Sequence, residues 1–134
     1  MPRVPRRLAL QVARRANGQC EYCQLPEGAA VLRFHPDHII AVKHKGRTAT
    51  LNLAWACFYC NSYKGSNIAG IDPVSGRLTR LFHPRKDKWS QHFEWFGAWV
   101  RGRNPVGRAT VQVLNLNHPE MLAVRRELKD EGLM

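Results

Sequence analysis

The chain lacks any long hydrophobic run, and no apolar stretch approaches the roughly 20 residues that a transmembrane helix needs. It also lacks internal repeats and low-complexity linkers. Its 134 residues fall in the size range of one domain. The content of 44% hydrophobic and 23% charged residues is typical of a chain that folds around a core. The sequence therefore predicts a single domain over residues 1–134 and no membrane partner.

Acidic residues are scarce as well. Asp and Glu number 10 against 21 Lys and Arg, which gives a formal net charge of +11 and a pI near 10.3. This balance argues against a protein that binds cationic metabolites and favours a polyanionic partner. The alternative is a soluble protein whose basic charge has no such partner.

The N-terminal 17 residues contain five Arg and no acid, a charge pattern shared with transit peptides. They lack Ser, however, and the apolar stretch at residues 8–10 is too short for a signal peptide. Leu8 and Val12 lie one helical turn apart, which predicts an amphipathic helix over residues 6–17 that ends at Gly18. We therefore expect a cytoplasmic protein.

Cysteines are few, and they form two CxxC pairs: Cys20 with Cys23, and Cys57 with Cys60. Two such pairs without a secretory signal predict a tetrahedral zinc site. The alternatives are redox-active pairs or two disulfides, but a disulfide within a CxxC pair is strained and reducible. Residues 24–56 separate the two pairs, which is a longer gap than in a simple zinc ribbon. Another structural unit is therefore expected between the two halves of the metal site.

Hydrophobic patterning and turn residues predict a mixture of short strands and helices. The expected strands lie over residues 30–34, 51–56 and 77–82. Residues 38–42 either pair with a neighbouring strand or continue irregularly, and residues 43–50 form a polar loop. Besides the N-terminal helix, the expected helices lie over residues 61–64, over residues 105–116, and from Pro119 to a point before Gly132. Trp89, Phe93 and Phe96 follow a helical period, which predicts a further helix whose aromatic side belongs to the core; the alternative is a surface that stacks bases.

The insertion between the two CxxC pairs, together with the residues directly after the second pair, carries three further motifs: Asp37-His38, Asn52-Leu53, and Asn61 followed by Lys64-Gly65. Interlocked with the CxxC pairs over residues 20–65, they resemble the HNH endonuclease family. Residues 81–93 and 107–110 also resemble an extension found in a bacterial subgroup of HNH proteins. In the loop, Lys45-Gly46 stands where the family often has two glycines. The resemblance implies an α+β fold with a small ββα-metal core tied by a zinc knuckle. An N-terminal helix and C-terminal helices would flank this core, with residues 66–134 as an extension.

The resemblance also implies a role for each motif residue. His38 corresponds to the general base, and histidine suits this task because its pKa lies near neutral. Asp37 and Asn61 correspond to the ligands of a single catalytic ion, and their hard oxygens suit Mg²⁺ or Mn²⁺. Asn52 corresponds to the residue that holds the loop and orients the histidine.

The distribution of charge supports a site at Asp37, which is the only acidic residue between Gly28 and Ile71. A lone carboxylate among cations suggests a metal ligand in a phosphate-binding surface, whereas the alternative is an aspartate that caps a turn. The basic residues expected on a nucleic-acid surface are Lys43, Lys45, Arg47, Lys64, Arg77, Arg80 and Arg85. His35 and His83 are further candidates for the active site, with a structural histidine as the alternative for each.

Three hypotheses follow from these features. The first is a metal-dependent DNA endonuclease that nicks with weak sequence preference, because one active site cuts one strand and no target-recognition domain is apparent. The second is a zinc-stabilised nucleic-acid binder without catalysis. The third is a zinc protein that acts through protein contacts. The presence of Asp37, His38 and Asn61 together favours the first, while the oligomeric state stays open.

Overall fold

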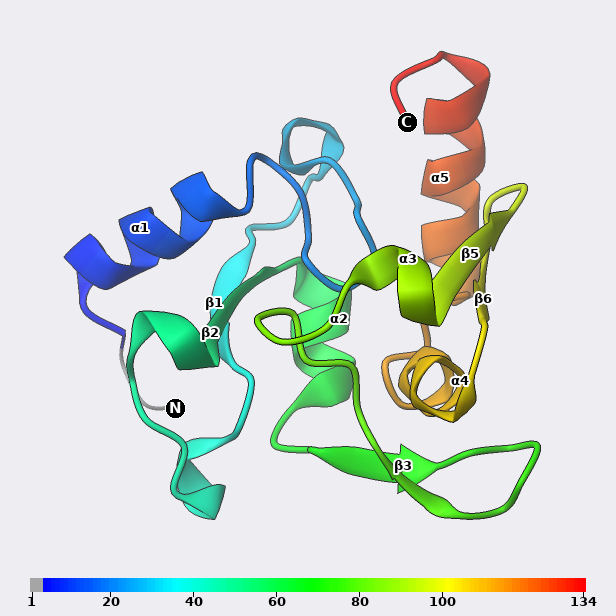
Figure 1. Cartoon of the computed structure of the whole chain (residues 1–134). Coiled ribbons are helices and arrows are strands. Elements are labelled where there is room, and N and C mark those ends of the chain that lie inside the picture. Colours follow the sequence, from blue (N-terminus) through cyan, green and yellow to red (C-terminus); the bar gives the residue numbers. More distant parts are fainter. Residues whose placement is uncertain (1–3) are drawn as a thin grey trace.

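The computed structural model describes residues 4–134, so the first three residues of the basic N-terminal stretch lie outside it. Within this range the chain has the predicted α+β fold, with helices interspersed among three two-stranded sheets (Figure 1). The helices are α1 (Arg6–Arg15), α2 (Phe58–Lys64), α3 (Trp89–His92), α4 (Pro105–Val113) and α5 (Pro119–Asp130). The strands are β1 (His35–His38), β2 (Leu53–Ala56), β3 (Ala69–Ile71), β4 (Leu78–Arg80), β5 (Phe93–Phe96) and β6 (Trp99–Gly102).

The ββα unit consists of β1, β2 and α2. The two strands are antiparallel, with His35 opposite Ala56 and His38 opposite Leu53. Helix α2 follows β2 directly, since the Cys57 sulfur caps it by accepting the Cys60 backbone N–H. Figure 1 shows α2 beside this strand pair. Each element is short, so their geometry is set by packing and by the cysteine cluster more than by intrinsic propensity.

The strand predicted over residues 30–34 is wrong. Those residues have no regular structure, and Val31 is 99% exposed although it is apolar. The strand lies one segment later, over the polar sequence of β1, because its backbone pairs with the apolar strand β2. Pairing with a well-buried partner has outweighed the hydrophobicity of the segment itself.

The helix predicted from the aromatic period is also wrong beyond its first turn. Helix α3 ends at His92, and the chain continues as β5, which pairs with β6. Phe93 is buried in the core, as expected, but Phe96 is 64% exposed. In a strand, residues three apart lie on opposite faces, so the aromatic stripe is split between the core and solvent.

Helices α1, α4 and α5 confirm the three other long helices that were predicted, each within a few residues of the expected ends. Asn104 caps α4 by accepting the Gly107 backbone N–H, and a proline stands in the first turn of both α4 and α5. No helix over residues 4–134 is long and apolar enough to cross a membrane.

One buried cluster joins the N-terminal half to the extension. Its members come from the cysteine pairs, from β2, β5, β6 and α5, and from the segments that precede α3 and α5; they include Cys20, Cys60, Ala54, Phe82, Phe93, Val100, Leu114, Met121 and Leu128. The extension therefore packs against the cysteine cluster and contributes to the same core.

Candidate active site and metal centre

The four cysteines form a closed cluster. Their Sγ atoms all lie within 4.8 Å of one another, and each side chain is at most 1% exposed. Tetrahedral zinc with Zn–S bonds of about 2.3 Å places its sulfurs about 3.8 Å apart, and the Sγ atoms of Cys23 and Cys57 are 3.7 Å apart. The backbone N–H groups of Cys23 and Cys60 also donate to Cys20 and Cys57 Sγ, at 3.5 and 3.4 Å. All four thiols are free, so the disulfide alternative is wrong, and this metal-binding cluster is consistent with structural Zn²⁺.

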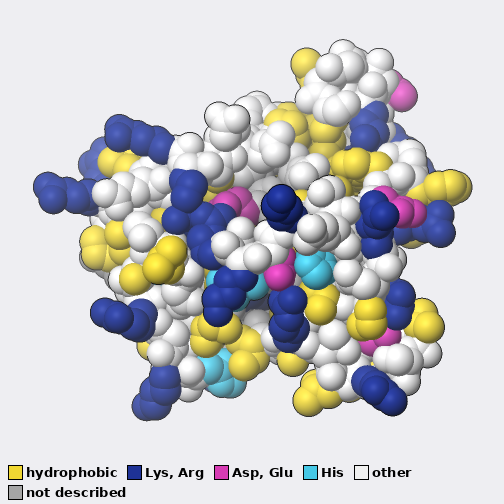
Figure 2. Space-filling model, in the orientation of Figure 1, with side chains coloured by type: hydrophobic (Ala, Val, Ile, Leu, Met, Phe, Trp, Pro, Cys, Tyr) yellow, Lys and Arg dark blue, Asp and Glu magenta, His cyan; other side chains and the backbone are white. Residues whose placement is uncertain are grey.

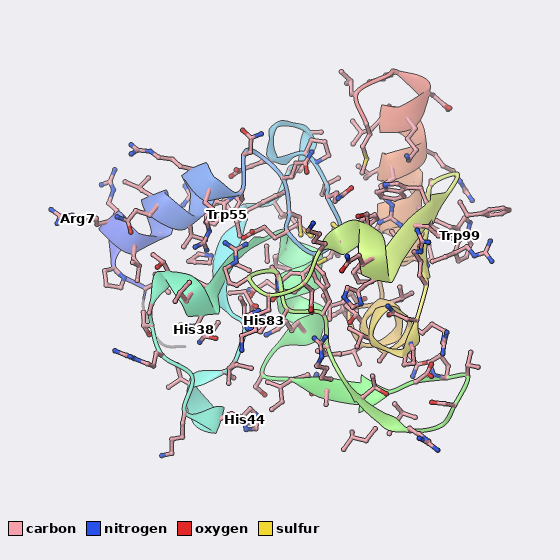
Figure 3. The ribbon with its side chains drawn as sticks, viewed as in Figure 1. Arg7, His38, His44, Trp55, His83 and Trp99 are labelled. Carbon is pink, nitrogen blue, oxygen red and sulfur yellow. The ribbon has the colours of Figure 1, made fainter. Side chains whose placement is uncertain are left out.

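A separate pocket of about 280 Å³ brings the motif residues together. Asp37 and His38 line it from the end of β1, and Asn61 lines it from α2. Asn61 lies one helical turn after Cys57, so the cysteine cluster that anchors the start of α2 also sets the position of Asn61. Figure 3 labels His38 in this part of the molecule. The site thus combines an imidazole, a carboxylate and an amide at one opening, whereas the buried cysteines offer no open position.

The His38 ring contacts a residue that sequence reasoning missed. Its Nε2 lies 2.9 Å from the Thr48 hydroxyl oxygen, in the loop between β1 and β2. Burial lowers the pKa of His38, the Lys64 ammonium adds to this effect, and the Asp37 carboxylate opposes it. The lowered pKa favours the neutral imidazole at neutral pH, which is the form that accepts a proton.

Asn52 closes the loop that carries Thr48. Its Oδ1 accepts the Ile40 backbone N–H at 2.9 Å, and its Nδ2 donates to the carbonyl oxygens of Ile40 and Arg47 at 2.9 and 2.8 Å. A Cβ at Gly46 would overlap the Ile40 carbonyl, so only glycine fits there. Lys45 has φ of 69°, in the left-handed region that favours glycine, which agrees with the glycine that the family often has at this position.

Asp37 is held by two buried side chains. The Tyr22 hydroxyl donates to Asp37 Oδ2 at 2.8 Å, and Lys64 Nζ lies 3.1 Å from the same oxygen. Burial raises the pKa of Asp37, while Lys64 and the Tyr22 hydrogen bond act against this rise. Oδ1 has only the longer 3.4 Å contact with Lys64, so it keeps acceptor capacity for one further partner. Asp37 and Asn61 therefore offer two hard oxygens that fit a divalent ion of the Mg²⁺ or Mn²⁺ class.

Comparison with known proteins agrees with this geometry. Residues 20–67 match the model of the HNH endonuclease family. The chain contains an HNH endonuclease domain. It is 25% identical over 143 residues to the Septu protein PtuA of Bacillus mycoides (strain KBAB4), covering 86% of this chain and 20% of that protein. It is also 25% identical over 126 residues to the Septu protein PtuB of Bacillus thuringiensis, covering 90% of this chain and 45% of that protein.

The chain thus spans less than half the length of either of these relatives. No solved structure matches it.

Two of the basic residues predicted to bind DNA, one in the HNH domain and one in the extension, are not free at the surface. Lys64 is 1% exposed, and its ammonium is used internally by Asp37 and by the His38 carbonyl oxygen at 2.9 Å. Arg85 is 12% exposed and forms an ion pair with Glu21. Burial and the neighbouring Arg15 lower the pKa of Arg85 to about 10. The predictions for Lys64 and Arg85 as surface contacts are therefore wrong, because each compensates a charge inside the fold.

The other predicted basic residues are exposed. Lys43, Lys45 and Arg47 lie on the loop that borders the pocket, and Lys43 itself lines it. Arg77 directly precedes β4, and Arg80 is the last residue of that strand. Arg80 forms an ion pair with Asp87 at 2.7 Å. Helix α1 adds exposed arginines that sequence reasoning did not assign to the nucleic-acid surface, and Figure 2 shows dark-blue side chains over this helix. The clustering of arginine before residue 17 was the available signal.

The two additional histidines do not line the pocket. His35 is exposed at the start of β1, at the opposite end of the strand from His38. His83 is half-buried in the segment between β4 and α3, where its Nδ1 accepts the Arg85 backbone N–H at 3.2 Å. Figure 3 labels His83 on that segment. The structure therefore gives His83 a structural contact and leaves His35 without a contact to the motif residues.

The ion pair between Asp37 and Lys64 predicts a large effect on stability. Asp37→Ala leaves a buried ammonium without its carboxylate, so we expect a loss of about 3–5 kcal/mol in the free energy of unfolding. Urea denaturation followed by circular dichroism measures this loss. Asn61→Ala is the control, because Asn61 is half-buried and its removal leaves no buried charge without a partner. This substitution is expected to lower the free energy of unfolding by about 1 kcal/mol or less. Equal stability of Asp37→Ala and the unmodified protein would contradict the buried pair.

Proposed function

We propose that this protein is a metal-dependent DNA endonuclease that hydrolyses phosphodiester bonds. The observation that carries the proposal is the pocket in which Asp37, His38 and Asn61 meet, within a domain of the HNH endonuclease family. Hydrolysis of a phosphodiester needs a base for the attacking water and positive charge near the phosphate. His38 would supply the base, and Asp37 and Asn61 would hold a divalent ion that supplies the positive charge.

In this proposal His38 accepts the proton of the attacking water. Its lowered pKa keeps the imidazole neutral, and its contact with Thr48 restrains the ring. Asn52 acts on His38 indirectly, because its three hydrogen bonds hold the loop that carries Thr48. Asp37 and Asn61 would hold one Mg²⁺ or Mn²⁺ ion, which when bound supplies positive charge for the scissile phosphate. The cysteine cluster would hold Zn²⁺ and keep α2, and with it Asn61, in place.

The substrate proposed here is duplex DNA. The loop residues Lys43, Lys45 and Arg47 are exposed beside the pocket, and the chain carries a net charge of +11. Such a surface attracts phosphates without reading base edges, so weak sequence preference is expected. Residues 4–134 form one such pocket, so the expected first product is a nicked strand.

A plasmid assay tests the proposal. Supercoiled plasmid should be converted to the open-circular form with Mg²⁺ or Mn²⁺, and not without added divalent ion. A brief treatment with EDTA should stop cleavage while elemental analysis still finds about one zinc per chain, because four thiolates bind zinc far more tightly than two oxygens bind Mg²⁺. Restoring Mg²⁺ or Mn²⁺ should restore cleavage.

The zinc-stabilised binder without catalysis predicts a different outcome in the same assay. Such a protein would bind the plasmid with an affinity that falls steeply with salt, yet leave it supercoiled with every divalent ion tried. That result, obtained with zinc-loaded and folded protein, would contradict the endonuclease proposal.

A further inference from the structure

The β5–β6 hairpin exposes two large aromatic side chains on one face. Phe96 and Trp99 are directly opposite each other in the pairing of the two strands, and they are 64% and 44% exposed. The other face is buried, with Phe93 and Val100 each 1% exposed. When one face of an antiparallel pair packs on the core, the other face is ordinarily polar. Two adjacent exposed rings are therefore a feature that the packing of the hairpin does not explain.

The backbone behind these rings is held firmly. Arg125, which is fully buried, donates from Nε to the Ala98 carbonyl oxygen at 2.8 Å. Asn117 accepts the Val100 backbone N–H and donates to the Val100 carbonyl oxygen, both at 2.9 Å. Helix α5 and the segment before it thus support the hairpin where Trp99 projects. A pinned backbone presents the rings with little ordering cost when a ligand binds.

The charge on the same face is mainly positive. The Arg101 guanidinium carbon lies 5.1 Å from the centre of the Phe96 ring, so the two side chains stack. Arg103 is also exposed and lies 3.8 Å from Glu94, the one acid on this face. Figure 3 labels Trp99 at the outer edge of the molecule, and Figure 2 shows hydrophobic and basic side chains together at that edge. Aromatic rings interleaved with arginines are the combination by which proteins bind unpaired bases.

We propose that this aromatic face, formed by Phe96, Trp99, Arg101 and Arg103, binds single-stranded nucleic acid. Bases stack on Phe96 and Trp99, and the two arginines contact the phosphates between them. Duplex bases are already stacked on one another, so the rings discriminate in favour of unpaired strands. The inference goes beyond the proposed cleavage, because it concerns a binding surface that shares no residue with the pocket of Asp37, His38 and Asn61.

Fluorescence anisotropy with a labelled DNA oligonucleotide tests the inference, using the full chain in its zinc-loaded form without added Mg²⁺ or Mn²⁺. Phe96→Ala and Trp99→Ala should each weaken binding of the single strand by about 5- to 150-fold, the fold-change that corresponds to roughly 1–3 kcal/mol per stacked base. Binding of the matching duplex should change by no more than about twofold, because its bases are already stacked on one another and do not stack on the two rings. Trp99→Phe should restore most of the single-strand affinity, because it keeps a ring.

Leu78→Ala is the matched control, because it shortens an apolar side chain that is 76% exposed on another hairpin. It should leave single-strand binding unchanged. Unchanged binding by the Phe96 and Trp99 variants would overturn the inference, and so would equal weakening for single strand and duplex. A drop in solution mass in the variants would also overturn it, because the rings would then belong to an interface between copies of the chain. The assay measures binding alone, without cleavage. Its result therefore tests the aromatic face even if the protein proves not to be an endonuclease.

Discussion

His38→Ala is expected to lower the rate of plasmid cleavage by about 10²–10⁴-fold, the usual contribution of a general base. Affinity for duplex DNA measured without added divalent ion should stay near that of the unmodified protein, because the variant keeps the exposed basic loop. Cleavage should fall because the variant lacks the imidazole that lines the pocket, whose pKa is lowered by burial and whose Nε2 contacts the Thr48 hydroxyl. Open-circle formation over time, with Mg²⁺ or Mn²⁺ in excess, measures the effect.

His44→Ala is the matched control for this experiment. His44 is an exposed histidine in the basic loop between β1 and β2, and it does not line the pocket. Its removal should change the cleavage rate by no more than about threefold if the role of His38 is specific. Retention of most metal-dependent cleavage by His38→Ala, in a preparation free of other nucleases, would rule out His38 as the base.

Cys60→Ala is expected to abolish both tight zinc binding and cooperative unfolding. Structural zinc sites bind with apparent free energies of about 10–16 kcal/mol, which matches or exceeds the total stability of about 5–15 kcal/mol of an ordinary domain. Cys60 is fully buried, and its cluster joins the N-terminal segment to α2 and packs against residues of the extension. Loss of one ligand should therefore unfold much of the chain. Elemental analysis and near-ultraviolet circular dichroism measure the two effects.

Asn61→Ala provides the comparison, because it changes the next residue of the same helix. It should purify folded with about one zinc per chain, as expected for a single closed thiolate site, and yet fail to cleave plasmid. This pair of variants separates the cysteine cluster from the pocket. The division of roles would be refuted by a folded, zinc-loaded Cys60→Ala protein or by loss of the tightly bound zinc in Asn61→Ala.

The sequence predicted the helices better than the strands. Helices α4 and α5 each begin at a proline, and their apolar residues recur with a helical period. Both features are local signals in the sequence. Strand β1 has no such signal, since its polar residues form a strand only because β2 is available to pair with it. The aromatic spacing from Trp89 to Phe96 satisfied a helical period by coincidence, and the pairing of β5 with β6 overrode it.

The sequence by itself determined the family of the domain, the cysteine set and the motif residues of the pocket. These are readable because they rest on rare residue types at fixed spacings along short stretches of chain. Only the tertiary structure decided that Lys64 is buried against Asp37, that Thr48 contacts His38, and that Phe96 and Trp99 face solvent together. Burial and contact depend on which distant segments pack against each other. A lysine beside a glycine or a phenylalanine in an aromatic stripe therefore has the same local sequence whether it lies inside or outside.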